Sequence, residues 1–97
     1  MLFQDKLKEL WESHNLLQRQ VAVGIDIDTA VYCKFENGYR QAWEEQVRLL
    51  AIFYGIPYEK LRLYWLAEKG YSLVEEEKEA NGILYMVAEE MEEYGKD

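Results

Sequence analysis

Apolar residues recur at helical spacing in the first and middle parts of the chain. The first such face predicts a helix that ends near Asn15. Its members are Phe3, Leu7, Leu10 and Trp11. A second face, followed by Gly55 as a helix stop, predicts another helix. Its members are Trp43, Val47, Leu50, Ala51 and Tyr54.

Two further helices are predicted after Gly55. Pro57 suits the first turn of a helix, where a missing N–H costs nothing, and the pattern continues to Gly70. Its apolar members are Leu61, Tyr64, Trp65 and Ala67. Residues 71–74, YSLV, are too short to assign and are left as a possible strand or extended joint. The last pattern predicts an amphipathic helix from about Glu76 to Tyr94.

The segment 18–38 has a spacing that no single helix or strand produces. Residues 18–25 read as one short helix that buries Val21, Ala22 and Ile25. A turn at Asp26 and Ile27 follows, because Asp tolerates the left-handed conformation better than most residues with a Cβ.

A second short helix follows this turn. Asp28 is placed to cap it by accepting from the free N–H groups of its first turn. The helix runs from Thr29 to about Glu36, buries Tyr32 and Phe35, and ends at Asn37-Gly38. The small Ala22 allows the two helices to approach closely. The whole segment is therefore predicted to be a helix-turn-helix.

Length and composition favour one compact, mostly helical domain, with 97 residues of which 49% are apolar. No run of eighteen apolar residues exists and charges begin at Asp5, so we expect no membrane span, no signal peptide and a cytoplasmic location. The single cysteine, Cys33, cannot form an intrachain disulfide.

Enzymatic chemistry is not indicated. The chain has one His, one Cys and serines only at 13 and 72, so no nucleophile with a base and an orienting group stands out. Glycine-rich phosphate loops and zinc-ligand spacings are also missing from the sequence. We therefore expect a protein that is not an enzyme and that uses no cofactor and no metal.

The net charge of −8 is unevenly distributed. Residues 1–74 hold ten acids and nine bases, a net charge of −1, whereas residues 75–97 hold nine acids and two bases, a net charge of −7. The acidity therefore belongs to the C-terminal segment 75–97, here called the acidic tail. The remainder is close to neutral, although affinity for a duplex depends largely on Lys and Arg.

The residues of the helix-turn-helix also carry a family resemblance. Their pattern resembles, without a gap, that of the Cro/C1-type (Xre-like) helix-turn-helix regulators, and the likeness extends over roughly residues 2–68 through the segment VRLLAIFYGIPYEKL. The matching residues are Gln18, Val21, Ala22, Ile25, Ile27, Tyr32, Phe35, Glu36 and Gly38. The chain departs at Leu17, Asp26 and Ala42, where the family usually has Ser or Thr, Gly, and Pro.

The resemblance implies an all-α fold and a function. The expected fold is a compact five-helix Cro/C1-type helix-turn-helix domain over residues 1–70, with an acidic C-terminal helix in residues 71–97. The expected function is sequence-specific regulation of transcription, with the recognition helix 28–36 in the major groove of double-stranded DNA. The implied base-reading residues are Thr29, Ala30, Val31 and Lys34. The implied phosphate contacts are Gln18, Arg19, Asn37, Gly38, Tyr39 and Arg40.

The apolar stripe of the last helix is wider than an exposed lone helix would keep, so the domain or a second chain must cover it. A homodimer is expected, because two domains about one helical turn of DNA apart read a palindrome together. The candidate dimer residues are Ile83, Leu84, Val87, Met91 and Tyr94. The alternative is an antitoxin-like protein-interaction module that keeps the fold with weak DNA affinity and whose acidic tail occupies a basic surface of another protein.

Overall fold

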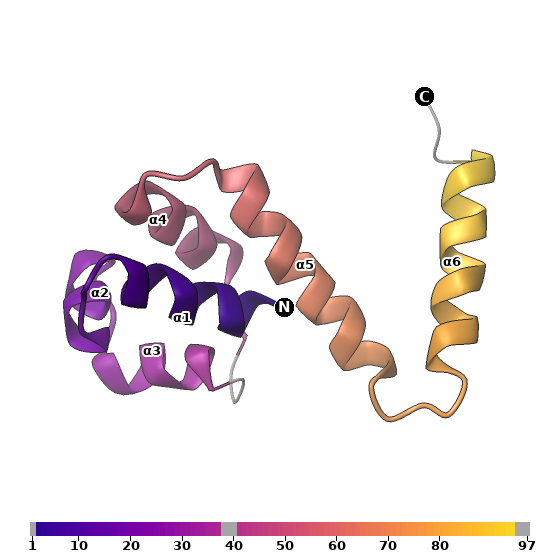
Figure 1. Cartoon of the computed structure of the whole chain (residues 1–97), viewed down its shortest axis with the longest axis horizontal. Coiled ribbons are helices and arrows are strands. Elements are labelled where there is room, and N and C mark those ends of the chain that lie inside the picture. Colours follow the sequence, from indigo (N-terminus) through magenta and orange to yellow (C-terminus); the bar gives the residue numbers. More distant parts are fainter. Residues whose placement is uncertain (1, 38–40, 95–97) are drawn as a thin grey trace.

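The computed structural model describes residues 2–37 and 41–94, and all regular secondary structure within them is α-helical. In chain order the helices are α1 (Phe3–Ser13), α2 (Gln18–Gly24), α3 (Thr29–Glu36), α4 (Glu44–Tyr54), α5 (Tyr58–Val74) and α6 (Ala80–Tyr94). Figure 1 shows α1 to α4 and the first half of α5 gathered together, with α6 standing apart. The expectation of an all-α fold is confirmed.

One core joins the first five helices. Helix α1 packs against α3 and α5, α2 packs against α3, and α4 packs against α5. The apolar faces predicted from the sequence supply this core, and its side chains that are 0% exposed include Leu7, Val21, Ala22, Tyr32, Val47, Leu50 and Leu61. Burial of each large apolar side chain contributes roughly 1.5–3 kcal/mol to folding. Packing of these apolar faces therefore holds α3 in place against α1 and α2.

The joint between α4 and α5 follows from its local chemistry. Gly55 ends α4 in the left-handed conformation at φ 68°, as predicted for a helix stop. Pro57 lies at the N-cap of α5, one residue before the first turn that the sequence suggested. At the other end of α4, Glu44 accepts from the hydroxyl of Tyr58 at 2.9 Å and from Nε of Arg62 at 3.2 Å. These exposed contacts link the start of α4 to the first two turns of α5.

Several predicted boundaries need correction. Residues 71–74 are not a strand or extended joint, because α5 continues without interruption through Gly70 to Val74, whose side chain is buried. The last helix begins at Ala80 rather than near Glu76, since residues 75–79 form turns. The first helix ends at Ser13, in agreement with the predicted end near Asn15, whose φ of 55° is incompatible with a helix.

Trp43 was also assigned wrongly. It was predicted to belong to the apolar face of the helix that stops at Gly55. It instead lies before α4 at the N-cap position and is 64% exposed. The neighbouring Ala42 occupies the core in its place, and its carbonyl accepts from Nε1 of Trp65 at 2.8 Å. The turn preceding α4 thus points a small residue inward and a large one outward.

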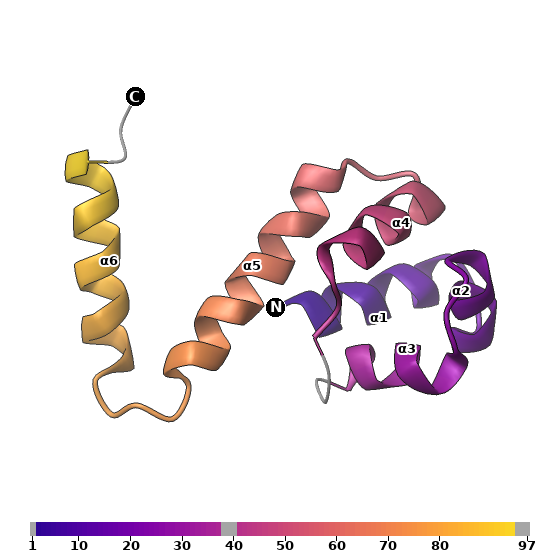
Figure 2. The same cartoon turned by 180° about the vertical axis from the view of Figure 1, so that it is seen from behind.

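Helix α6 takes part in none of the packed helix pairs. It follows the turns of residues 75–79, and both views show it separated from α1–α4 (Figures 1 and 2). Every side chain from Asn81 to Glu93 is exposed. Among the described residues, no helix is long and apolar enough to cross a membrane.

Candidate nucleic-acid interface

The helix-turn-helix is built by backbone hydrogen bonds and one side-chain cap. Asp26 adopts the left-handed conformation at φ 58°, as its position in the predicted turn requires. The chain then reverses so that the N–H of Ile27 reaches the carbonyl of Ala22 at 2.9 Å. Asp28 caps α3 by accepting from the N–H of Ala30 at 2.8 Å. The predicted turn and cap are both confirmed.

Helix α2 begins without the hydroxyl cap that is usual in the regulators which the sequence resembles. Leu17 lies at its N-cap, and no side chain caps the helix from that position. The side chain of Gln20 instead accepts from the N–H of Leu17 at 2.7 Å. The first turn of α2 is therefore closed by a residue inside the helix, and the fold tolerates the substitution at position 17.

Helix α3 presents one face to the core and one to solvent. Tyr32 and Phe35 are 0% and 2% exposed and hold the helix against α1. Of the four predicted base-reading residues, Thr29, Ala30 and Lys34 are exposed on the outer face. Val31 is half-buried and packs against the core, which leaves less of its side chain for a base contact.

The predicted phosphate-contacting residues are in different situations. Arg19 and Asn37 are exposed, and Asn37 is also the C-cap of α3. Gly38, Tyr39 and Arg40 lie outside the described residues. The side chain of Gln18 is occupied: its Nε2 donates to Oε2 of Glu36 at 2.5 Å, and its Oε1 accepts from Sγ of Cys33 at 3.2 Å.

This bridge from Gln18 to Glu36 and Cys33 ties the start of α2 to the end of α3. Periodicity and helix capping could not reveal it, because its partners are 15 and 18 residues apart. The signal in the sequence was that Gln18 and Glu36 both match the family pattern. The partners of Glu36 and Cys33 in this bridge belong to an uncharged amide, so the bridge brings no positive charge to the end of α3.

The electrostatics of the surface are mixed. Around the described part of the helix-turn-helix, Arg19 and Lys34 supply positive charge, whereas Asp26 and Asp28 supply exposed negative charge. Lys34 lies in the last turn of α3, where a cation is also favoured by the helix dipole. The described residues hold no group of three or more His, Cys, Asp or Glu side chains that could hold a metal ion.

The chain is similar to a curated protein from Vibrio cholerae, the cryptic phage CTXphi transcriptional repressor RstR, with 35% identity over 60 residues. The chain is a distant homologue of this Cro/C1-type helix-turn-helix repressor. The resemblance inferred from the sequence is thereby confirmed, and the homologue is a transcriptional repressor rather than an enzyme.

The match has a defined extent. It covers 62% of this chain and 54% of the repressor, so the chain spans about half the length of the curated relative. No family profile and no solved structure matches the chain.

The dimer candidates on α6 are brought to one exposed surface. Ile83 and Leu84 are 37% and 46% exposed, and Val87 and Met91 are 54% and 61% exposed. The side chain of Tyr94 lies outside the described set. Because all four described candidates face solvent, the stripe predicted from the sequence is present and is not covered by the other residues that the structure describes.

Proposed function

We propose that the chain is a sequence-specific DNA-binding transcriptional regulator. In this proposal α1–α5 form a five-helix Cro/C1-type domain that inserts α3 into the major groove, and α6 is an acidic extension. The observation that carries the proposal is the geometry of α3 in a homologue of a repressor: Tyr32 and Phe35 anchor the helix, and Thr29, Ala30 and Lys34 face outward.

The exposed face of α3 has chemistry suited to base edges. The ammonium group of Lys34 donates to O6 or N7 of guanine, and the hydroxyl of Thr29 bonds to a base or a phosphate. Ala30 packs on a thymine methyl group, and the exposed part of Val31 does the same at the inner edge of the contact. Together these side chains distinguish a short run of base pairs.

Phosphate contacts fix the register of α3 on the duplex. Arg19 at the start of α2 and Asn37 at the end of α3 bracket the reading face, and the proposal adds Gly38, Tyr39 and Arg40 from the following segment. Gln18 acts through its bridge to Glu36, which holds α2 and α3 in a fixed relation, and it contacts phosphate with its backbone. The regulator acts as a cytoplasmic homodimer.

The first test separates base reading from phosphate binding. A preferred duplex is selected from a random pool, and binding is followed by fluorescence anisotropy as salt is varied. Lys34→Ala is expected to relax the preference at one base position and to cost about 1–3 kcal/mol. Arg40→Ala is expected to weaken binding to all duplexes alike. It is also expected to reduce the slope of affinity against salt concentration by the contribution of about one phosphate contact.

Arg48→Ala provides the matched control. Arg48 is an exposed cation on α4, and α4 and α3 lie on opposite sides of α1 in both views (Figures 1 and 2). Its removal is expected to leave the base preference and the salt slope unchanged. Equal, sequence-independent losses from the Lys34 and Arg40 variants would remove Lys34 from the reading role. A chain that shifts no genomic fragment at low salt would contradict DNA binding and leave the protein-interaction module as the function.

A further inference from the structure

Helix α6 carries an apolar stripe that the rest of the described residues leave uncovered. Residues Ala80, Leu84, Val87 and Met91 follow the alternating four- and three-residue spacing of a packed helix seam. Of these, Leu84, Val87 and Met91 are 46%, 54% and 61% exposed. An apolar helical face of this kind requires a partner surface.

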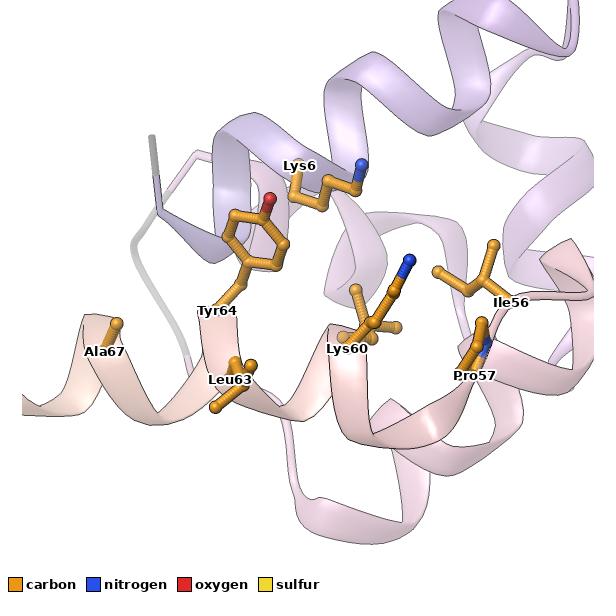
Figure 3. Close-up of a pocket in the computed structure, with 8 residues that line it drawn as sticks. Lys6, Ile56, Pro57, Lys60, Leu63, Tyr64 and Ala67 are labelled. Atoms are coloured by element: carbon orange, nitrogen blue, oxygen red, sulfur yellow. The ribbon is translucent and has the colours of Figure 1, made fainter.

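A groove of about 600 Å³ lies between α1 and α5. Its floor on α5 is a stripe at helical spacing made by Leu63, Tyr64 and Ala67, and Ile56 and Pro57 close one end (Figure 3). Lys6 reaches over from α1 with its Nζ 5.5 Å from the centre of the Tyr64 ring. Leu63 is 68% exposed, so the floor is open to another helix.

The groove and α6 complement each other in charge. Lys60 lines the groove and points into the open space in Figure 3, whereas Lys6 lines it from α1 with its Nζ 2.9 Å from Oε1 of Glu9. Helix α6 holds four glutamates and no basic residue, and its acids stand beside the apolar stripe at positions 89, 90, 92 and 93. An acidic apolar helix therefore fits an apolar groove with basic edges. Parallel pairing of two α6 helices would instead bring the glutamates of residues 89–93 toward each other.

The two elements also match in length. Helix α6 has 15 residues and α5 has 17 residues, which at 1.5 Å per residue are about 22 and 25 Å long. Gly70 continues the open face of α5, since a Cβ added there would meet nothing within 4 Å. One helix of the size of α6 therefore covers the groove and the exposed half of α5 together.

The turns of residues 75–79 direct α6 away from its own groove. The N–H of Glu77 donates to the carbonyl of Val74 at 2.9 Å, and the N–H of Ala80 donates to that of Glu77 at 3.3 Å. We propose that two copies of the chain exchange their C-terminal helices, with α6 of each copy seated in the α1/α5 groove of the other. The inference deepens the proposed function, on which it rests, by assigning the surface that joins two reading helices.

Complementation between two defective chains tests the exchange. Leu63→Asp damages the groove and leaves α6 intact, whereas Val87→Asp/Met91→Asp damages α6 and leaves the groove intact. All three positions are exposed, so the core is untouched. Each variant alone is expected to sediment as a monomer where the unmodified chain is a dimer, with a dissociation constant raised more than about tenfold because an unpaired carboxylate is costly to bury. Their mixture is expected to form a 1:1 heterodimer through the one intact groove and helix.

Two matched control variants change exposed apolar residues that lie outside the proposed contact between α6 and the groove. Ile52→Asp on α4 and Met86→Asp on α6 alter side chains that are both 72% exposed, and both variants are expected to remain dimeric. Lys60→Glu is expected to weaken the dimer and Lys60→Arg to retain it. Circular dichroism confirms that each variant is folded. Failure of the two defective chains to associate, or an unmodified chain that stays monomeric because α6 closes on its own groove, would overturn the exchange.

Sedimentation is performed without DNA, so the exchange and the proposed function fail separately. A dimer that persists in Leu63→Asp while the chain still selects a duplex through Lys34 overturns the exchange and leaves DNA reading intact. Successful complementation in a chain that shifts no duplex supports the exchange and contradicts DNA reading. In that outcome the groove and α6 serve a dimer with another function.

Discussion

Two buried phenols show how single residues set the response of the fold to pH. Tyr32 is 0% exposed and Tyr54 is 7% exposed. Burial raises the pKa of Tyr54 to about 12, and burial also raises the pKa of Tyr32 above its ordinary value. Both stay protonated in the folded chain, whereas tyrosines of the unfolded chain ionise near pH ~10. The stability that these groups contribute is present below that pH and is lost as pH rises through the folded pKa.

We therefore expect the free energy of unfolding to fall above pH 10 by about 1.4 kcal/mol per pH unit for each of the two tyrosines. Tyr54→Phe removes one titrating group, so its slope between pH 10 and 12 is expected to be about half as steep. Urea unfolding at a series of pH values measures this slope of the free energy of unfolding against pH. Tyr71→Phe, at a side chain that is 54% exposed, is the control and is expected to keep the original slope. Equal slopes for both variants would contradict the buried-phenol explanation.

At the scale of elements, α2 lies close to α4 at Gly24, a residue with no side chain. A Cβ added at Gly24 would overlap the ring of Phe53 on α4. Gly24→Ala is therefore expected to destabilise the fold by about 1–3 kcal/mol, because the ring or the helix must shift. Thermal and urea unfolding measure the loss, and Phe53→Leu in the same chain is expected to recover part of it.

Gly82 is the matched control for that substitution. It lies on exposed α6, and the nearest atom to an added Cβ is Oε2 of Glu79 at 3.7 Å. Gly82→Ala is expected to favour α6 by up to about 1 kcal/mol through helix propensity alone, with a rise in helical circular dichroism. A Gly24→Ala chain as stable as the original would show that the Phe53 ring moves aside without cost.

For the whole molecule, the acidic tail combines two opposing effects. Residues 75–97 carry a net charge of −7 from nine acids and two bases, and they include the only helix that takes part in no packed pair of described helices. Deleting them is expected to give a monomer that binds non-specific DNA more strongly at low salt, because repulsion of phosphate is removed. The same monomer is expected to lose its preference for a two-half-site operator, because only paired domains read a palindrome.

Salt-titrated anisotropy on one-half-site and two-half-site duplexes, together with sedimentation, checks both expectations. The dimer-breaking Leu63→Asp variant is the control, since it keeps the tail charge. It is expected to lose the two-half-site preference without gaining non-specific affinity. Unchanged non-specific binding after the deletion would show that the acidic tail lies away from the DNA.

The sequence by itself determined the helical fold class, the helix-turn-helix and its capping. These features depend on periodicity and on local hydrogen bonds, such as Asp28 to Ala30, whose partners are close along the chain. Helix ends were less determined: α5 continues through residues 71–74, where propensity alone gave no clear signal.

Only the tertiary structure decided which candidate side chains remain available. Gln18 is held by Glu36, 18 residues away, and Val31 packs partly into the core. The groove joins Lys6 of α1 to a stripe of α5 more than fifty residues later, and α6 is directed away from it by the turns of 75–79. The contacts of Gln18, of Val31 and of the groove arise from how the helices pack, and no local pattern in the chain encodes them.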